Sequence, residues 1–419
     1  MTEVRRITLA AGEGRALGPT FRTAAADGPS ADVAAALADV RLRGDAAVLD
    51  AIRRFDAPGF DRPSPVVDPA EIVAAVDSLD SRLRDAISFA AEQVRTVAEA
   101  GRPPEWEVTL PPGQSVRMRV VPVSAAGVYV PGGRAAYPSS LIMGVVPAQV
   151  AGVSRIMVAS PPGPDGLPNR VVLAAAGLLG VHEIVAAGGA AAIGAMAFGT
   201  GTIPPVDVIA GPGNAWVQEA KRQVFGLVGI DSVAGPSELL VLADSTSDPE
   251  AIAADLLAQA EHGPDSPAVC VAWDRGVNDA VEAALFLRQG PVGRITLVDC
   301  PSQEDAIVLA EAFAPEHLQI ALADAAAVAP RIHRAGCVFL GPLGGTAFGD
   351  YVAGSNHILP TGGAARYASA VGPATYMRRM ALVDIPQDAV DVLTPHLAAL
   401  ADAEGFPEHR RSAEIRSSR

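Results

Sequence analysis

The chain has 419 residues, a formal net charge of −15 at pH 7 and a hydrophobic content of 49%. Its length and apolar content support a large buried core and exclude a wholly disordered chain. The acidic balance argues against nucleic acid and anionic membrane surfaces as partners.

The three cysteines, Cys270, Cys300 and Cys337, follow no disulfide or metal-binding spacing. The first residues contain no apolar core of a secretion signal. We therefore expect a cytoplasmic protein with neither disulfides nor a cysteine-based metal site.

Two uncharged runs, 135–154 and 184–206, are long enough to be tested as membrane spans. Pro138 and Pro147 interrupt the first run, and several glycines and a Pro-Pro pair interrupt the second. Because a helix that spans a bilayer must be continuous, we expect both runs to be buried segments of an α/β core and no membrane partner.

Residues 1–110 are predicted to be mostly helical, since 30–43 and 70–100 carry apolar residues at helical spacing. From about Val116 onward, short β-rich runs alternate with helical stretches, with glycine or proline at the junctions. This alternation is typical of a parallel sheet covered by helices on both faces.

The β-rich runs fall into two sets, which predicts an α/β protein with two Rossmann-like, doubly wound lobes of related topology. The expected strands are 127–130, 155–159, 183–187 and 206–210 in one lobe, and 239–243, 268–272, 294–298 and 337–340 in the other. From about Val371 the sheet pattern ends, and a helix over 388–402 precedes a short polar tail that is too small to fold alone.

Two glycine-rich turns, Gly188-Gly189 and Gly211-Pro212-Gly213-Asn214, each follow an expected strand and open an expected helix. Such turns allow a phosphate to approach backbone N–H groups at a helix start. No complete G-x-G-x-x-G sequence is present. A nucleotide site and a turn that serves only close strand–helix packing both remain open.

Four of the seven histidines lie in polar clusters at the ends of expected elements. Gln259 and His262 share a helix face just before a Gly-Pro stop, where they are either ligands or a polar helix end. Glu316 and His317 are adjacent, and in a loop both could reach a cleft and move protons.

The two remaining clusters add further polar groups. Asp350 and His357 follow the strand 337–340, so we expect them at the carboxyl end of a sheet, where ligands bind in α/β folds. Glu404 and His409 lie in the terminal tail. Imidazole, carboxylate and amide groups suit zinc, manganese or cobalt, although no spacing here matches a known zinc motif.

Taken together, these segments resemble the histidinol dehydrogenase family. The resemblance is strongest between about residues 120 and 365. The motifs that carry the resemblance are Gly127-Val-Tyr-Val-Pro-Gly-Gly133, Gly211-Pro-Gly-Asn214, Lys221-Arg-Gln223, Ala234-Gly-Pro-Ser-Glu238, Gln259-Ala-Glu-His262, Pro315-Glu-His-Leu318, Gly349-Asp-Tyr351 and Asn356-His-Ile-Leu-Pro-Thr361.

The resemblance implies a homodimeric zinc enzyme that oxidises L-histidinol to L-histidine through a retained aldehyde, reducing two NAD. It places Gln259, His262 and Asp350 on zinc, with His409 supplied by the partner subunit. It makes Glu316 and His317 the acid/base pair.

The same resemblance assigns further contacts. Besides the metal ligands and His317, the expected substrate contacts are Ser237, Glu404, His357 and Ser139. The expected NAD contacts are Tyr129 and Asn214.

We accordingly divide the chain into an N-terminal segment (1–26), a discontinuous lobe with the metal and catalytic residues (27–125 and 238–371), an NAD lobe (126–237) and a C-terminal helical tail (372–419) that completes the partner's site.

The chain departs from the family pattern at the Gly188-Gly189 turn, where Ala191 replaces the glutamine expected to contact NAD. The alternative hypothesis is therefore a related zinc/NAD dehydrogenase for another small alcohol, such as a sulfonated diol. A zinc hydrolase would leave the glycine-rich lobe without a purpose, and a binding protein without catalysis would not need the complete set of chemical residues.

Overall fold

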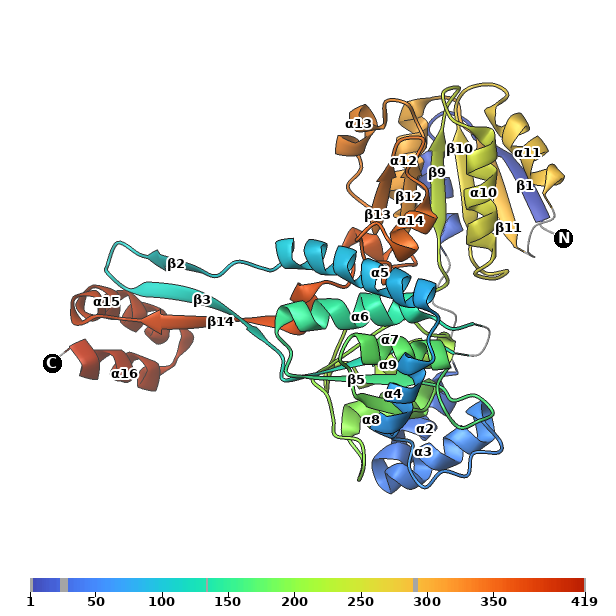
Figure 1. Ribbon diagram of the computed structural model, residues 1–419. Coiled ribbons are helices and arrows are strands. Elements are labelled where there is room, and N and C mark those ends of the chain that lie inside the picture. Colours follow the sequence, from blue (N-terminus) through green and yellow to red (C-terminus); the bar gives the residue numbers. More distant parts are fainter. Residues whose placement is uncertain (1–2, 23–28, 133–134, 289–292, 418–419) are drawn as a thin grey trace. The chain divides into compact units, whose positions relative to one another are not determined.

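The computed structural model describes residues 3–22, 29–132, 135–288 and 293–417 (Figure 1). The chain forms two compact units. The first contains residues 1–101 and 124–376, and the second contains 102–123 and 377–419. The fold class is confirmed as α/β with parallel sheets.

A six-stranded parallel sheet in the first unit has the order β1-β11-β10-β9-β12-β13. Its strands are β1 (Glu3–Thr8), β9 (Leu239–Ala243), β10 (Ala268–Ala272), β11 (Arg294–Asp299), β12 (His317–Ile320) and β13 (Cys337–Leu340). Every residue of β9 and β10 is buried, as expected for parallel strands that helices cover on both faces.

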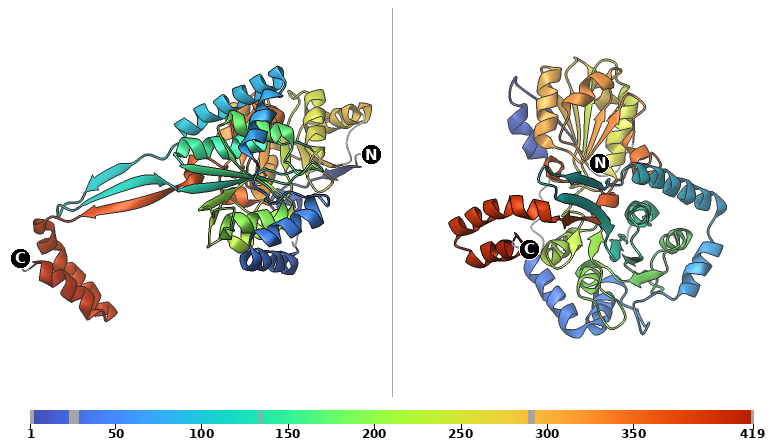
Figure 2. Two further views of the ribbon diagram at one scale, coloured as in Figure 1. Left: turned by 60° about the horizontal axis from the view of Figure 1, so that its bottom comes forward. Right: turned by 90° about the vertical axis from the view of Figure 1, so that its left-hand side faces the viewer.

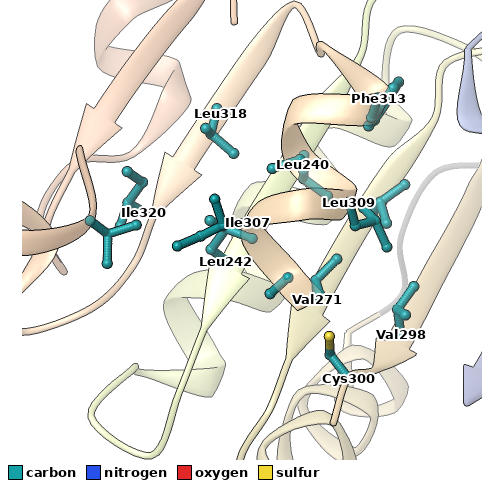
Figure 3. Packing of buried hydrophobic residues seen from close by; sticks show 14 of the residues in the cluster. Leu240, Leu242, Val271, Val298, Cys300, Ile307, Leu309, Phe313, Leu318 and Ile320 are labelled. Atoms are coloured by element: carbon teal, nitrogen blue, oxygen red, sulfur yellow. The ribbon is translucent and has the colours of Figure 1, made fainter. Parts of the chain in front are cut away.

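Alternate residues of these strands enter two separate cores. On one face, Leu240, Leu242 and Val271 pack against Ile307 and Phe313 of α12 (Gln303–Phe313), as Figure 3 shows. On the other face, the intervening strand residues pack against helices α10 and α11. The bounds of the remaining helices of this half are α10 (Pro249–Ala260), α11 (Val277–Leu287), α13 (Ala325–Val328), α14 (Thr346–Tyr351) and α1 (Gly14–Leu17), which contacts α12.

A five-stranded parallel sheet has the order β6-β5-β4-β7-β8. Its strands are β4 (Ala125–Tyr129), β5 (Arg155–Ser160), β6 (Glu183–Ala186), β7 (Val208–Ala210) and β8 (Gly229–Ile230). Numbered along the chain, both sheets have the order 3-2-1-4-5, with β1 added to the edge of the larger one. This order belongs to doubly wound folds, whose direction reverses next to the first strand.

Two pairs of helices accompany the five-stranded sheet, and the helices in each pair contact each other: α6 (Pro138–Ala151) with α7 (Arg170–Leu178), and α8 (Gly189–Phe198) with α9 (Ala215–Val224). The N-terminal helices pack on these four. Their bounds are α2 (Ser30–Arg43), α3 (Asp45–Ala51), the π-helical turn Ile52–Asp56, α4 (Pro69–Asp77) and α5 (Ser81–Ala100).

Local sequence explains how these helices begin. Asp68 caps α4 by accepting the N–H of Ala70, Pro69 follows it, and Glu71 completes a capping box. Asp80 caps α5 in the same way. The expected helix over 70–100 is therefore two helices, because the second cap interrupts it. The domain boundaries proposed above remain a prediction, although the helices within 30–100 contact α6–α9.

The second unit combines a three-stranded antiparallel sheet with two helices (Figure 2). Its elements are β2 (Trp106–Thr109), β3 (Ser115–Pro122), β14 (Met377–Asp384), α15 (Gln387–Glu404) and α16 (Pro407–Ser417). β3 pairs with both β2 and β14, and α15 contacts α16.

The structure corrects two expectations about elements. Residues 1–110 are mostly helical as expected, with the strands β1 and β2 in addition, whereas β14 follows the point at which the sheet pattern was expected to end. The polar tail after 402 contains the helix α16. The sequence pattern did not predict β1 and β14 because each pairs with a strand remote in sequence. β1 pairs with β11, and β14 pairs with β3. Short 3-10 turns complete the described elements: Gly18–Phe21, Ala329–Arg331, Ala364–Arg366 and Pro373–Tyr376.

In the described part of the chain, every helix is too short or too polar to cross a bilayer. The run 135–154 contains α6 and the run 184–206 contains α8, and both helices are interior elements of the first unit.

Candidate active site

A cavity of about 1100 Å³ lies in the first unit, lined by residues from both halves. The half with the five-stranded sheet supplies the carboxyl ends of its strands, through Pro131 after β4 and Gly211 after β7. The half with the six-stranded sheet supplies the amino ends, through Ser237 before β9 and His317 at the start of β12. Asp350 and His357 were expected at the carboxyl end of the sheet that contains 337–340, but they line the cavity at the amino ends of that sheet, so this expectation is wrong.

The chain reaches Glu316 and His317 through an unusual backbone turn. Ala314 ends α12 in the left-handed conformation, with φ 53°, the only positive φ of a non-glycine residue among those described. The turn redirects the chain from the helix into β12. Both Glu316 and His317 are buried and both line the cavity, which confirms that the adjacent pair can face one cleft.

Glu316 is a buried carboxylate surrounded by donors. Its Oε2 accepts a hydrogen bond from Ser237 Oγ at 2.7 Å and from the Glu238 N–H at 2.8 Å. Burial opposes ionisation, but the charge of His317 and these hydrogen bonds outweigh it and hold the pKa of Glu316 below its usual range. The group is therefore ionised at neutral pH and able to accept a proton.

His317 lies between two carboxylates. Its Nδ1 is 3.2 Å from the Glu238 carbonyl oxygen and 3.4 Å from Glu316 Oε2, while its Nε2 is 3.6 Å from Asp350 Oδ1. Burial lowers the pKa of His317, but the attraction of Glu316 and then of Asp350 raises it overall to about 9. Nδ1 is held by its partners, so Nε2 is the nitrogen available to a ligand.

Glu238 is a second, fully buried carboxylate behind this pair. It accepts the N–H of Gly362 at 3.0 Å and the N–H of Glu316 at 3.3 Å. The carboxylate thereby connects the amino ends of β9 and β12 to the loop at 362. Sequence reasoning did not assign Glu238, although it stands next to Ser237 in a motif that we quoted.

His357 and Ser139, which the resemblance assigns to substrate, both line the cavity. His357 Nδ1 is 2.8 Å from the Asp350 carbonyl oxygen, and burial lowers its pKa. The hydroxyl nearest its other nitrogen belongs to Ser140, at 3.4 Å. Ser140 was missed because two adjacent serines at a helix start give no sequence signal that distinguishes them.

Gln259 and His262 lie at the end of α10 and just beyond it, as predicted. His262 lines the cavity, with its Nδ1 3.3 Å from the Gln259 carbonyl oxygen. The Gln259 side chain is buried, and its Nε2 has no hydrogen-bond partner. His262 and Asp350 line the cavity, whereas Gln259 is not among the lining residues. An imidazole, a carboxylate and an amide are donor types that fit a divalent ion.

No group of three or more His, Cys, Asp or Glu residues suited to a metal occurs among the described residues. Glu404 ends α15 and His409 lies on α16, so both belong to the second unit. His409 contacts Phe406, with ring centroids 5.2 Å apart.

The two glycine turns are satisfied by the protein itself. The N–H of Gly188 donates to Asp56 Oδ2 at 2.9 Å, and the N–H of Gly189 donates to the Tyr129 hydroxyl at 3.2 Å. At the other turn, Asn214 Oδ1 accepts the N–H groups of Trp216 and Val217 and caps α9. These four N–H groups thus already have partners in the protein.

The expected NAD contacts differ in exposure. Asn214 lines the cavity, whereas Tyr129 is buried and is not among the lining residues. Burial raises the pKa of Tyr129 to about 12. Ala191 is buried in the first turn of α8. Further cavity residues that sequence reasoning did not assign are Tyr137, Gln218, Glu219, Arg222, Asp231 and Thr361.

Comparison with known proteins gives a consistent family. The family model of histidinol dehydrogenase matches residues 22–417. The histidinol dehydrogenase of Parasynechococcus marenigrum is 44% identical over 391 residues, which cover 90% of this chain and 89% of that protein. The enzyme of Rhodospirillum rubrum is 44% identical over 399 residues, 92% of each chain.

A solved structure agrees with these matches. The crystal structure of histidinol dehydrogenase from Elizabethkingia anophelis superposes with a TM-score of 0.91 at 31% identity, covering 99% of this chain and 98% of that one. These relatives bear the name that the sequence motifs predicted, and the alternative of a dehydrogenase for a sulfonated diol is not favoured.

The half-buried Asp56, which accepts the Gly188 N–H, has a testable effect on stability. Burial raises the pKa of Asp56 to about 6, against the lowering effect of the Gly188 N–H. The folded protein therefore binds this proton more tightly than the unfolded chain, and the carboxyl group destabilises the fold increasingly as the pH rises. With an unfolded pKa near 3.8, the cost grows by about 1.4 kcal/mol between pH 5 and pH 8.

We predict that the free energy of unfolding of Asp56→Asn rises relative to wild type by about that amount between pH 5 and pH 8. Asparagine keeps an oxygen that can accept the Gly188 N–H and does not ionise. Urea unfolding of both proteins at the two pH values measures the difference. A difference that is independent of pH would contradict the assignment.

Proposed function

Because the chain belongs to the histidinol dehydrogenase family, we propose that it oxidises L-histidinol to L-histidine through L-histidinal, with two NAD reduced per substrate. The observation that carries the proposal is the cavity that brings Glu316, His317, His262 and Asp350 together. A buried acid/base pair beside nitrogen and oxygen ligands for a divalent metal ion suits oxidation of an alcohol.

Zinc is the proposed metal, one ion per subunit. Gln259, His262 and Asp350 would hold it from one subunit and His409 from a second copy of the chain. The proposal is supported by His262 and Asp350, which line one cavity, and by the family to which the chain belongs. When bound, zinc would anchor the substrate and polarise its oxygen, and NAD would accept the hydride.

The acid/base steps follow from the two buried groups. His317 presents Nε2 to the substrate, because its Nδ1 is held by the Glu238 carbonyl and Glu316. In its neutral form, which its raised pKa of about 9 makes the main form only at alkaline pH, His317 would take the hydroxyl proton in the first oxidation, release it to solvent and accept a proton again in the second. Glu316, ionised and next to the cavity, would remove a proton from the water that adds to the aldehyde.

Further contacts complete the proposed complex. Besides His317 and the four metal ligands, Ser237, Ser139, His357 and Glu404 would contact substrate. Tyr129 and Asn214 would contact NAD. The proposed assembly is a homodimer in the cytoplasm, with each site shared between the two chains.

Histidinol oxidation is predicted to produce two NADH per substrate. Purified, zinc-loaded protein is mixed with L-histidinol and excess NAD, and the NADH absorbance is compared with histidinol consumed. A ratio near one would show that the aldehyde is released. No NADH from a protein that binds zinc would contradict the proposed substrate and call for a screen of other alcohols.

His409→Asn is predicted to reduce zinc content to less than half that of the wild-type dimer, because one imidazole ligand is lost. His396→Asn, also exposed in the second unit, is the matched control. Metal analysis after dialysis measures both. Unchanged zinc in His409→Asn would exclude this residue as a ligand.

The same variant tests whether the sites are shared. Mixing His409→Asn with Glu316→Gln subunits gives hybrid dimers in which one of two sites keeps both residues. Random exchange should restore about a quarter of wild-type activity from two nearly inactive parents. No recovery after verified exchange would place both residues in a site formed by one chain.

Glu316→Gln is predicted to slow oxidation of histidinal by about 100-fold or more, because general-base assistance to water is lost. Reduction of histidinal by NADH, the reverse of the first step, should fall by less than about tenfold. Glutamine retains an oxygen for Ser237 and the Glu238 N–H. Equal losses in both assays would contradict this role. The control is Glu304→Gln, the same substitution at an exposed glutamate earlier in the chain.

A further inference from the structure

Lys221 is the only lysine in the 419 residues; the other 31 of the 32 basic residues are arginine. Arginine therefore serves at every other site where this chain needs a positive charge. The one exception is a fully buried side chain on α9, at 0% exposure. Lysine is almost never fully buried unless it is paired, so this position has a specific requirement.

The contacts of Lys221 show what the ammonium group holds. Its Nζ donates to the Gly211 carbonyl oxygen at 3.0 Å and forms an ion pair with Asp231 Oδ1. The other carboxylate oxygen, Asp231 Oδ2, accepts the Gly211 N–H at 2.9 Å. Lys221 and Asp231 thus hold both polar backbone groups of a single residue.

Gly211 is the first residue of the turn that forms one wall of the cavity. Gly211 follows β7 with φ 124°, and an added Cβ would lie 2.1 Å from the Tyr129 carbonyl oxygen. Gly211, Pro212, Gly213 and Asn214 all line the cavity, and Asn214 caps α9. Lys221 itself does not line the cavity, so it can act on a ligand only through the turn.

Arginine cannot perform this task. An ammonium group is compact and directs three N–H bonds at separate acceptors, whereas a guanidinium is a larger, planar fork. At 0% exposure the extra atoms have no solvent to occupy, and overpacking of a core displaces the backbone around it. The atoms that would move first are those of Gly211 and Asp231, which touch Nζ.

We propose that Lys221 is a positioning residue for the nicotinamide cofactor: with Asp231 it fixes the Gly211 turn in the conformation that binds NAD, and arginine does not replace it. This inference rests on the proposed function, since it takes NAD as the ligand of the turn. The proposed zinc ligands and substrate contacts lie outside the Gly211 turn, so zinc and substrate binding should be little affected.

The test compares Lys221→Arg with wild type and with Arg43→Lys, a swap at an exposed ion pair far from the cavity lining. Isothermal titration calorimetry measures NAD and histidinol binding separately, and metal analysis measures zinc. We expect Lys221→Arg to weaken NAD binding at least tenfold and raise the KM for NAD in proportion. Histidinol affinity, zinc content and kcat at saturating NAD should stay within about twofold.

A second variant keeps the test decisive if Lys221→Arg does not fold. The double variant Lys221→Met/Asp231→Asn removes both buried charges together and leaves no unpaired ion. It should show the same selective loss of NAD affinity, because the Gly211 carbonyl loses its donor. A variant that loses NAD, histidinol and zinc binding equally would show a structural role only and overturn the proposal.

The single lysine also gives a direct signal. Wild-type protein labelled with lysine carrying ¹³C at Cε should show one lysine resonance, which shifts on addition of NAD but not of histidinol alone. An unmoved resonance, together with wild-type NAD affinity in Lys221→Arg, would overturn the proposal. Wild-type protein that binds no NAD would overturn the proposed function and this inference with it. NAD binding without histidinol oxidation would contradict the function alone.

Discussion

Two buried carboxylates at the amino ends of neighbouring strands impose the main constraint on this site. Glu238 and Glu316 are almost fully removed from solvent, and a buried charge must be compensated by hydrogen bonds or opposite charge. The compensation comes from backbone N–H groups, from Ser237 and from His317. Because these donors lie on different segments, the constraint fixes β9, β12 and the loop at 362 relative to each other.

The two sheets share one strand order but contribute opposite ends to the cavity. The five-stranded sheet offers the carboxyl ends beside its reversal point, as doubly wound folds usually do. The six-stranded sheet offers the amino ends of β9 and β12, on either side of its own reversal point. Related topology therefore provides two different surfaces, one suited to turns and the other to buried acid/base groups.

Hydrogen bonds from other residues of the protein hold the glycine turns in place. Asp56 and Tyr129 occupy the N–H groups at the start of α8, and Lys221 with Asp231 occupies the polar groups of Gly211. These partners make the turns rigid before any ligand binds, which lowers the entropy cost of binding.

The sequence by itself determined the parallel α/β class, the eight expected strands and the family, because burial on both faces gives continuous apolar runs and because motifs are local. It also placed Gln259 next to His262 and Glu316 next to His317. Tertiary structure alone decided that β1 and β14 join sheets through remote partners, and that the six-stranded sheet uses its amino ends. The roles of Glu238 and Lys221 were equally hidden, since a buried charge is defined by partners that lie far apart in sequence.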